Sequence, residues 1–363
     1  MAHLPLSNRR GVRCMWMRGG TSKGAYFLAE DLPSDMAARD QLLLALMGSP
    51  DVNQIDGIGG AHPLRSKVAI VKPSQEPGID IDFVFAQVSV TEPLVDTSPN
   101  CGNILAGVAP FAIERGLMAA KDSETTVRVR TINTGTVADL VVRTPGGIVQ
   151  YSGEARIDGV PGTSAPIKID FLDFAGSVCG ELLPTGAVRN VINDVPVTCI
   201  DNGMPVVVIA AQALARTGYE SVEALNSDAD LKTRLESIRL AAGQLMGLGD
   251  VVRKVIPKMT LVASPQNGGA IATRTFIPHA CHTSIGVFGA VSVATVCVLP
   301  GSVAEGIAQV PPGDDILLSI EHPTGEFTVH LELERGGVVP NVKRAGLVRT
   351  ARKLFDGEVF GRD

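Results

Sequence analysis

The amino-acid sequence predicts an α/β protein made of two similar domains, and three observations support this prediction. The chain has 363 residues, more than the length at which a single hydrophobic core stops growing. Aromatic residues make up only 4% of it, so the core has to be built from Val, Ile, Leu and Ala, as in strand-rich α/β proteins. Strand-like and helix-like patterns alternate along the chain, and the second half repeats the order of the first.

The first half is expected to alternate strands with two helices. A strand over 12–17 runs into the glycine turn Gly19-Gly20, and a helix over 36–47 ends at a Gly-Ser-Pro sequence. A second helix over 103–115 stops at a glycine, a residue common at helix C-termini. Further strands are expected over residues 66–71, 79–90, 127–132, 137–143 and 148–151.

The second half repeats this order although its residues have diverged. A strand over 197–200 leads into a polar turn at 201–203, as the first strand of the chain leads into its glycine turn. A helix over 228–246 takes the place of the first helix, and the apolar segment 286–299 takes the place of the second.

Chemically interesting positions repeat as well. The strand VIPKMTLV aligns with the strand LRSKVAIV, which places Lys258 opposite Lys67. The segment HTSI at 282–285 precedes an apolar helix, as CGNI at 101–104 does. Four correspondences in the same order indicate an internal duplication.

A duplication of this kind implies two similar domains that face each other. We place them at residues 1–182 and 183–363, and leave open whether the C-terminal segment packs across this boundary. Duplicated domains usually hold a ligand in the cleft between them. It is open whether Lys258 reaches this cleft, and a remnant of the duplication is the slightly better interpretation. The sequence also leaves open whether the chain forms a homodimer.

Composition and charge exclude several classes of function. The net charge is −6 and there is no long basic run, so we expect no nucleic-acid partner. No stretch approaches the ~20 apolar residues that a membrane-spanning helix needs, and no signal peptide is visible. The six cysteines are scattered without a CxxC pair, which is typical of reduced thiols. We therefore expect a cytoplasmic protein with no membrane partner.

Cys101 is the first candidate for chemistry, because it lies between Asn100 and Asn103 where an apolar helix begins. A thiol there faces unpaired N–H groups and the positive end of the helix dipole, which lowers its pKa. The same N–H groups can hold a carboxylate or stabilise an enolate. The alternative is a buried structural cysteine.

Lys67 is the second candidate, at the start of an otherwise apolar strand. Burial and the nearby charge of Arg65 would both lower its pKa toward a value at which a lysine can act as a base. The alternative is a lysine that extends along the edge of the sheet to reach water.

The glycine turn RGGTSKG at 18–24 resembles a phosphate loop but lacks the Walker spacing and contains no GxGxxG. Its free N–H groups and the hydroxyls of Thr21 and Ser22 suit a carboxylate, and a plain tight turn is the alternative. His279, Cys281 and His282 are too close in sequence for a tetrahedral zinc site, so we expect no metal.

Longer motifs carry a family resemblance. RGGTSKG at 18–24, GGAHPLRSKVAIV at 59–71 and NCGNILAGVAPFAIERG at 100–116 resemble the 2-methylaconitate cis-trans isomerase family, which is related in fold to diaminopimelate epimerase. The resemblance continues through GVPGTSAPI, LLPTG, IDNGMP and IPKM, and so covers nearly the whole chain. The compact length and the closing segment from HPTGEFTV onward are most similar to the 4-oxalomesaconate isomerases or tautomerases of protocatechuate and gallate breakdown.

The resemblance implies that each domain is a sheet wrapped around a central helix, with the active site in the cleft between the domains and no metal or organic cofactor. It also implies that Lys67 and Cys101 transfer protons on a small unsaturated polycarboxylate. Diaminopimelate epimerase uses one cysteine from each half, whereas this chain has His282-Thr283-Ser284 at the matching turn, with Cys281 one residue away. The residues expected to bind the substrate are Gly19, Gly20, Thr21, Ser22, Ser66, Asn100, Gly102, Asn103, Asn202, Met204, His282, Thr283 and Ser284.

The expected mechanism begins with neutral Lys67, which removes a proton from a carbon next to a conjugated alkene. N–H groups of the two helix starts and of the glycine turn would stabilise the resulting dienolate. Lys67 or Cys101 would then return the proton at the other end of the allylic system. Three alternatives stay open: a 2-methylaconitate isomerase, an amino-acid epimerase, and a non-catalytic anion-binding protein of the same fold.

Overall fold

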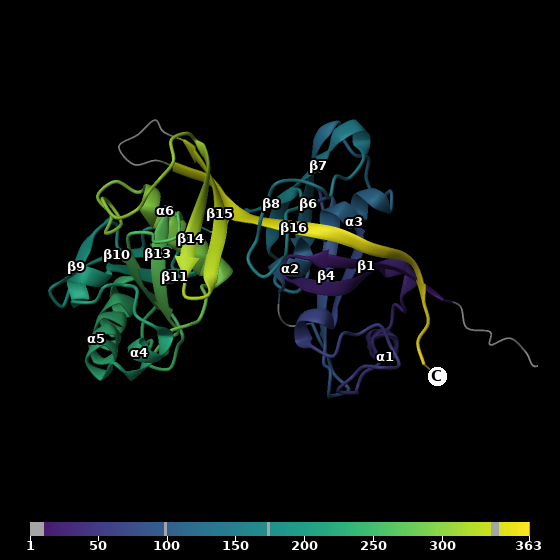
Figure 1. The fold of residues 1–363 in the computed structure, drawn as a ribbon, viewed down its shortest axis with the longest axis horizontal. Coiled ribbons are helices and arrows are strands. Elements are labelled where there is room, and N and C mark those ends of the chain that lie inside the picture. Colours follow the sequence, from purple (N-terminus) through teal and green to yellow (C-terminus); the bar gives the residue numbers. More distant parts are fainter. Residues whose placement is uncertain (1–10, 98–99, 173–174, 335–340, 363) are drawn as a thin grey trace, which may run out of the picture. The chain divides into compact units, whose positions relative to one another are not determined.

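The computed structural model describes residues 11–97, 100–172, 175–334 and 341–362. The chain forms two compact units (Figure 1): unit 1 runs to Ile169 and includes the residues from Arg349 onward, and unit 2 comprises Asp170–Val348. We expected a boundary after residue 182, whereas the chain passes into unit 2 after Ile169 and returns to unit 1 after Val348.

Unit 1 is built on a sheet that closes on itself. The C-terminal strand β16 pairs with β1 on one side and with β8 on the other, so the ring has no edge strand. Its strands follow in the order β1 (Val12–Gly19), β2 (Ser22–Leu28), β3 (Lys67–Pro73), β4 (Ile81–Val88), β6 (Ser123–Thr131), β7 (Val137–Thr144), β8 (Pro166–Phe171) and β16 (Asn341–Val359), while β5 (Val95–Asp96) pairs with β4.

Helices cover both faces of this sheet. Inside lie the two short helices α2 (Gly102–Leu105) and α3 (Val108–Glu114), and the ring of Phe111 contacts that of Tyr26 at 5.8 Å between centroids. Outside lies α1 (Met36–Met47), whose buried leucines pack with Trp16 and Phe27. Because successive strand residues point to opposite faces, a strand covered on both faces, such as β3, has side chains in both cores and is apolar over most of its length.

Unit 2 repeats this plan around the single helix α6 (Val287–Val298). This helix is buried along most of its length and contacts β10, β11, β14 and β15. The helices α4 (Val222–Ser227) and α5 (Ala229–Leu245) cover the other face. Beside the first part of β16, the strands follow in the order β15 (Gly325–Glu334), β14 (Asp315–His322), β13 (Ile271–Phe276), β12 (Lys258–Ala263), β11 (Pro205–Ala210), β10 (Val195–Asp201) and β9 (Asn190–Ile192).

The pairing pattern confirms the internal duplication. In unit 1 a hairpin β1–β2 is followed by β3 parallel to β2, β4 antiparallel to β3, and β6 parallel to β4. In unit 2 the hairpin β10–β11 is followed by β12 parallel to β11, β13 antiparallel to β12, and β14 parallel to β13. The predicted two-unit α/β fold, each unit with a sheet around a central helix, is therefore confirmed.

Most predicted elements lie within a few residues of their observed bounds, and two differ. The expected strand over 148–151 is absent; the segment follows the 3-10 helix η3 (Pro145–Gly147), and the N–H of Gln150 donates to the carbonyl of Arg143 outside any strand. The expected helix over 103–115 is divided into α2 and α3 next to Gly107, where a Cβ would lie 2.3 Å from the hydroxyl of Tyr26. The other short 3-10 helices are η1 (Ala29–Asp31), η2 (Pro63–Arg65) and η4 (Ala211–Leu214).

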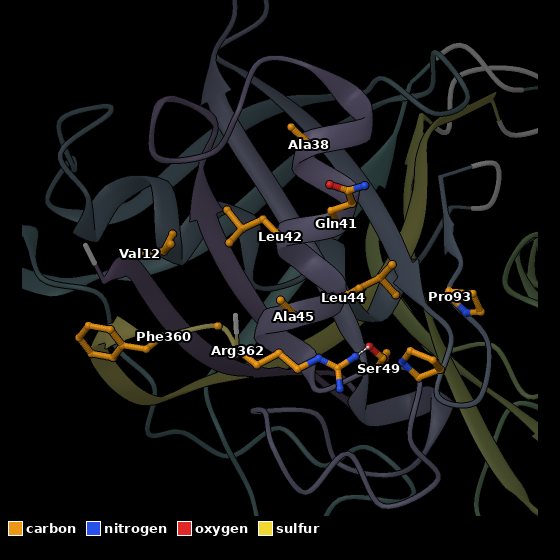
Figure 2. A pocket seen from close by; sticks show the side chains of 12 residues that line it. Val12, Ala38, Gln41, Leu42, Leu44, Ala45, Ser49, Pro93, Phe360 and Arg362 are labelled. Atoms are coloured by element: carbon orange, nitrogen blue, oxygen red, sulfur yellow. Dashed lines mark hydrogen bonds between the residues drawn. The ribbon is translucent and has the colours of Figure 1, made fainter. Parts of the chain in front are cut away.

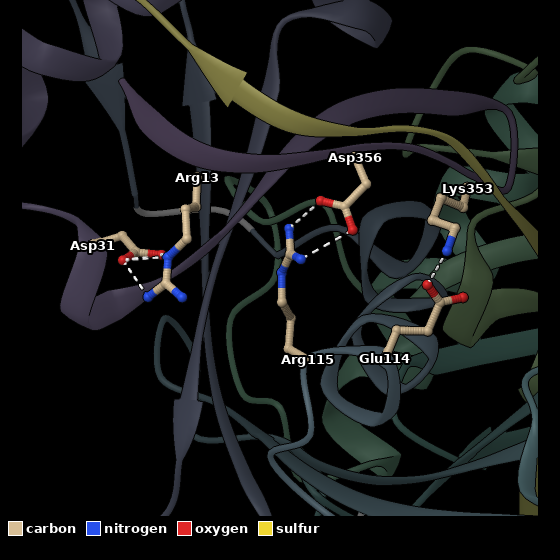
Figure 3. A network of polar contacts seen from close by, with 6 residues as sticks. All are labelled: Arg13, Asp31, Glu114, Arg115, Lys353 and Asp356. Atoms are coloured by element: carbon tan, nitrogen blue, oxygen red, sulfur yellow. Dashed lines mark hydrogen bonds and ion pairs between the residues drawn. The ribbon is translucent and has the colours of Figure 1, made fainter. Parts of the chain in front are cut away.

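Ion pairs connect the second part of β16 to the rest of unit 1 (Figure 3). Both oxygens of Asp356 accept from the guanidinium of Arg115, at 2.6 and 3.0 Å, and Lys353 pairs with Glu114 at the end of α3. These contacts add to the backbone pairing of β16 with β1 and help to close the sheet. Within the described ranges, no helix is long and apolar enough to span a membrane.

Candidate active site

The glycine turn between β1 and β2 lies directly against the first residues of α2. The Asn103 amide nitrogen donates to the hydroxyl of Thr21 at 3.0 Å and approaches that of Ser22 at 3.4 Å. A Cβ on Gly19 would lie 2.2 Å from the carbonyl oxygen of Asn103, and one on Gly20 would lie 2.1 Å from its side-chain oxygen. The turn and the helix can approach this closely only because both positions are glycine. The structure thus brings five of the predicted residues together.

Cys101 is the N-terminal cap of α2, and its setting differs from that of the other cysteines. Its N–H donates to the side-chain oxygen of Asn100 at 2.8 Å, its carbonyl accepts from Leu105, and it is half-buried. Burial raises the pKa of the other five thiols, to about 11 for Cys281 and to about 12 for Cys14, Cys179, Cys199 and Cys297, so these thiols stay protonated at neutral pH.

Lys67 is the first residue of β3 and only 8% of it is exposed. Its ammonium nitrogen donates to the side-chain oxygen of Gln87 at 2.7 Å and lies 4.9 Å from the ring centroid of Phe85. The amide nitrogen of Gln87 donates to the carbonyls of Pro63 and Ser66 at 3.0 Å each, which fixes the amide so that its oxygen faces Lys67. Lys67 is therefore held by a neutral acceptor, and the described residues contain no ion pair to it.

The start of β3 and the helix α2 border the same point of β2. Gly24 stands opposite Lys67 in the parallel pairing of β2 with β3. A Cβ on Gly24 would lie 2.5 Å from the carbonyl oxygen of Lys67 and 3.2 Å from a methyl group of Ile104 in α2. Lys67 and Cys101 therefore come from neighbouring elements of one unit.

Other predicted residues of unit 1 take part in internal contacts. Ser66 is fully buried, and its hydroxyl lies 2.6 Å from the side-chain oxygen of Gln54 and 3.1 Å from the carbonyl of His62. This places Ser66 as support for the loop before Lys67. Gly102 is the first residue of α2, and the amide of Asn100 approaches Thr134 at 3.5 Å.

In unit 2, the predicted turn residues are tied to α6. Asn202 is buried, and its side-chain nitrogen donates to the hydroxyl of Thr295 at 2.8 Å. The hydroxyl of Ser292 accepts from the N–H of Asn202 at 3.2 Å and donates to the carbonyl of Met204 at 2.8 Å. The turn between β10 and β11 is thus fixed by hydroxyl groups of the central helix.

The predicted HTS segment forms a compact turn before α6. The ring Nδ1 of His282 accepts from the N–H of Ser284 at 3.0 Å, and the hydroxyl of Ser284 lies 3.2 Å from Nε2 of His322. Thr324 donates its hydroxyl to the carbonyl of Thr283 at 2.8 Å. His322 and Thr324 belong to the HPTGEFTV segment, which the sequence analysis used only for the family resemblance.

The sequence analysis did not identify Gln87 and Phe85 as neighbours of Lys67, although the sequence contains a signal for Gln87. Gln87 is a polar residue in a mostly apolar strand, and it stands opposite Lys67 in the antiparallel pairing of β3 with β4. Pairing two predicted strands in this register would have identified it. Within residues 11–97, 100–172, 175–334 and 341–362, no group of three or more His, Cys, Asp or Glu residues is placed to hold a metal ion.

A cavity of about 650 Å³ in unit 1 lies apart from these residues. It is lined by one side of α1 and by the residues after β16, including Leu42, Ala45 and Phe360, and Arg362 donates to the carbonyl of Ser49 at 2.7 Å (Figure 2). None of the predicted site residues lines it. The polar groups around Lys67 and Cys101, not the size of this cavity, therefore locate the candidate site.

Comparison with known proteins decides the family. Residues 9–362 match the PrpF protein family, almost the whole chain. The chain belongs to the PrpF family. It is 60% identical over 353 residues to the (4E)-oxalomesaconate Delta-isomerase of Novosphingobium sp. (strain KA1), covering 97% of this chain and 98% of that protein. It is 58% identical to the 4-oxalomesaconate tautomerase of Pseudomonas putida, covering 97% of each chain.

A solved structure of an isomerase is similar to this chain over nearly its whole length. The crystal structure of a methylitaconate-delta-isomerase matches this chain with a TM-score of 0.86 and 34% identity, covering 98% of this chain and 96% of that one. The predicted family and the prediction of an isomerase are therefore confirmed.

Proposed function

We propose that this PrpF-family isomerase acts on 4-oxalomesaconate, a small unsaturated polycarboxylate, by moving a proton and a double bond. The observation that carries the proposal is the buried Lys67 held by the neutral amide of Gln87, beside the α2 segment that begins at Cys101. The names of the two relatives at 58% and 60% identity supply the substrate. The chemistry is an allylic or keto–enol isomerisation.

Lys67 acts as the base in this proposal. A lysine must be neutral to accept a proton, and an adjacent carboxylate would hold it as the ammonium ion. The neutral acceptor Gln87 orients the nitrogen without supplying such a charge. Neutral Lys67 then removes a proton from a carbon next to the conjugated alkene and becomes an ammonium ion, while the electron pair moves onto the carbonyl or carboxylate oxygen.

The glycine turn and the start of α2 stabilise the dienolate formed by this step. The backbone N–H groups of Gly102 and Asn103, at the start of α2, are donors that stabilise charge on oxygen, whereas the N–H of Gly20 already donates to the carbonyl of Thr350 at 2.8 Å. Thr21 is an exposed residue whose hydroxyl oxygen accepts from Asn103, so its hydroxyl hydrogen adds a further donor. A proton then returns to the far end of the allylic system from Lys67 itself, which restores the neutral lysine, or from the thiol of Cys101. In the second case Lys67 is left as an ammonium ion and Cys101 as a thiolate, and the enzyme regains its starting state when Lys67 releases a proton to water and the thiolate takes one up.

The remaining predicted residues are proposed as substrate contacts. Asn202, Met204, His282, Thr283 and Ser284 lie at the two turns beside α6 in unit 2. We also propose a cytoplasmic location and a role in the breakdown of protocatechuate or gallate. The location is supported by the six cysteines, all of which are free thiols.

A second substrate, 2-methylaconitate, is compared directly because a more distant relative is named for it. The chain is 33% identical to the 2-methyl-aconitate isomerase of Shewanella oneidensis, against 58–60% for the relatives named for 4-oxalomesaconate. The test follows the ultraviolet change of each substrate with purified enzyme in deuterated water. We expect a kcat/KM for 4-oxalomesaconate at least ~100-fold above that for 2-methylaconitate. A preference for 2-methylaconitate, or no turnover of 4-oxalomesaconate, would reject the proposed substrate.

A further inference from the structure

We propose that Lys258 in unit 2 binds a carboxylate group of the substrate, so that the duplicated lysine has kept a function of its own. This inference rests on the proposed function, because it takes the polycarboxylate as the ligand. It concerns a residue for which the sequence alone slightly favours a remnant of the duplication.

The position of Lys258 in unit 2 corresponds to that of Lys67 in unit 1. Lys258 is the first residue of β12 and stands opposite Val206 in the parallel pairing with β11, as Lys67 begins β3 and stands opposite Gly24 in β2. The next residue, Met259, belongs to the core cluster that packs around α5. Because strand residues alternate between faces, Lys258 points to the opposite face, toward α6.

The surroundings of Lys258 confirm this direction. Its ammonium nitrogen lies 3.4 Å from the point that a Cβ on Gly286 would occupy, and Gly286 directly precedes α6. The lysine is half-buried, and burial lowers its pKa. It is therefore a cation partly removed from water at one end of the central helix.

Unlike Lys67, Lys258 has no acceptor in the part of the chain that the structure describes. Lys67 has Gln87 opposite it on β4, whereas β13 ends at Phe276, opposite Met259, one position before Lys258 would find a strand partner. The first turn of α6 contains no acidic residue and no side-chain cap. The described residues provide no partner that compensates the desolvation of this charge, and an anion placed beside it would provide one.

The hydroxyl of Ser284, two residues before Gly286, favours a carboxylate as that anion. Thr324 donates its N–H to Nδ1 of His322 at 3.3 Å, so in the neutral ring the proton is on Nε2. Nε2 then donates to the hydroxyl oxygen of Ser284 at 3.2 Å, which leaves the hydrogen of Ser284 to be donated to a ligand. The ammonium of Lys258 and the hydroxyl of Ser284 are both hydrogen-bond donors. They therefore suit the oxygens of a carboxylate and do not suit a cation.

The test compares Lys258→Met with Lys254→Met, which removes the same charge from an exposed lysine of unit 2 whose ammonium donates to the carbonyl of Leu248. We expect Lys258→Met to raise KM for 4-oxalomesaconate by about 10-fold or more, as for loss of a charged hydrogen bond, with kcat changed less than about 3-fold. Lys254→Met should match wild type. Lys258→Gln is a second variant that keeps the experiment informative where Lys258→Met folds poorly, as judged by thermal unfolding.

A pH profile separates ligand binding from a structural role. Only the ammonium form attracts a carboxylate, so substrate affinity should fall as pH rises through the lowered pKa of Lys258. The variants should lose this pH dependence of KM, whereas a purely structural lysine would leave its shape unchanged. Unchanged KM and unchanged pH dependence in both variants would overturn the proposal.

Further experiments test whether the anion bound by Lys258 is the substrate, and separate failure of this proposal from failure of the proposed function. Tricarballylate, an unreactive tricarboxylate, should inhibit wild type competitively and inhibit Lys258→Met at least ~10-fold more weakly. Inorganic phosphate is the second probe. If its binding depends on Lys258 but does not compete with the substrate, the proposal that Lys258 binds the substrate is overturned. Lys258→Met should still catalyse solvent proton exchange at saturating substrate, whereas failure of the proposed function would remove turnover from the wild type itself.

Discussion

Lys67 donates its ammonium hydrogen to the side-chain oxygen of Gln87 at 2.7 Å, and the amide of Gln87 is itself fixed by two backbone carbonyls. A neutral side chain thus stands where a carboxylate would form an ion pair. The neutral partner matters for catalysis, because a lysine paired with a carboxylate stays protonated and cannot accept a proton.

Gln87→Glu tests this relationship by adding one charge at the same position. The new carboxylate should stabilise the ammonium form of Lys67, so the pH–rate profile should move to higher pH and kcat at pH 7 should fall about 10-fold or more. The measurement is kcat against pH. Gln87→Leu is the control, since it removes the acceptor without adding charge; an equal displacement of the profile in both variants would contradict the electrostatic explanation.

Cys101 should be the first cysteine to react with iodoacetamide near pH 8. The other five thiols have pKa values raised to about 11 or 12 by burial and are mostly protonated there. Peptide mapping by mass spectrometry should find the first label on Cys101, with substrate slowing the labelling. Cys101→Ser should reduce kcat, by less than Lys67→Met if one base performs both transfers. Earlier labelling of any other cysteine would count against this account.

Gly19→Ala should disturb the contact between the glycine turn and α2. The added Cβ would lie 2.2 Å from the backbone oxygen of Asn103, so either the turn or the helix has to move. We expect a loss of unfolding free energy of about 1–3 kcal/mol and a clear loss of kcat. Gly357→Ala in β16 is the matched control, because nothing lies within 4 Å of its added Cβ. Wild-type activity and stability in Gly19→Ala would show that the turn does not need this close approach.

Asp356→Asn should weaken the closure of the sheet in unit 1. It removes the charge from a pair in which both carboxylate oxygens bond Arg115, whose side chain is only 18% exposed. Chemical denaturation should show a loss of about 1 kcal/mol that decreases in high salt. Asp40→Asn, which weakens a pair between sequence neighbours, Arg39 and Asp40, should change stability less. An equal loss in the two variants would argue against a particular role for β16.

Much of the fold could be predicted because hydrophobic periodicity is a local property. The helix expected over 36–47 matches α1, and the helix expected over 228–246 matches α5 to within one residue at each end. The division between α2 and α3 lies at Gly107, which the hydroxyl of Tyr26 approaches so closely that a Cβ there would lie 2.3 Å from it. This is a tertiary contact that no local sequence pattern contains. The sharing of β16 between the two units could only be left open from the sequence, since strand pairing partners are not encoded in periodicity.

The candidate site was predictable where residue type and motif coincided. The turn at Gly19-Gly20 and the start of α2 were chosen for their N–H groups, and the structure brings the two segments together through Asn103. The N–H of Gly20, however, is not free, because it donates to the carbonyl of Thr350. Gln87 was missed because its importance comes only from its register with Lys67. The same kind of information, strand register, makes Lys258 interpretable in unit 2.

The most direct test of the central claim is the rate at which Lys67→Met exchanges substrate hydrogen with deuterated water. The account predicts that this variant, folded as judged by thermal unfolding, loses isomerisation and exchange together by at least ~100-fold. Lys72→Met, on the exposed part of the same strand, should exchange at the wild-type rate. Exchange in Lys67→Met within a few-fold of wild type would show that another group is the base.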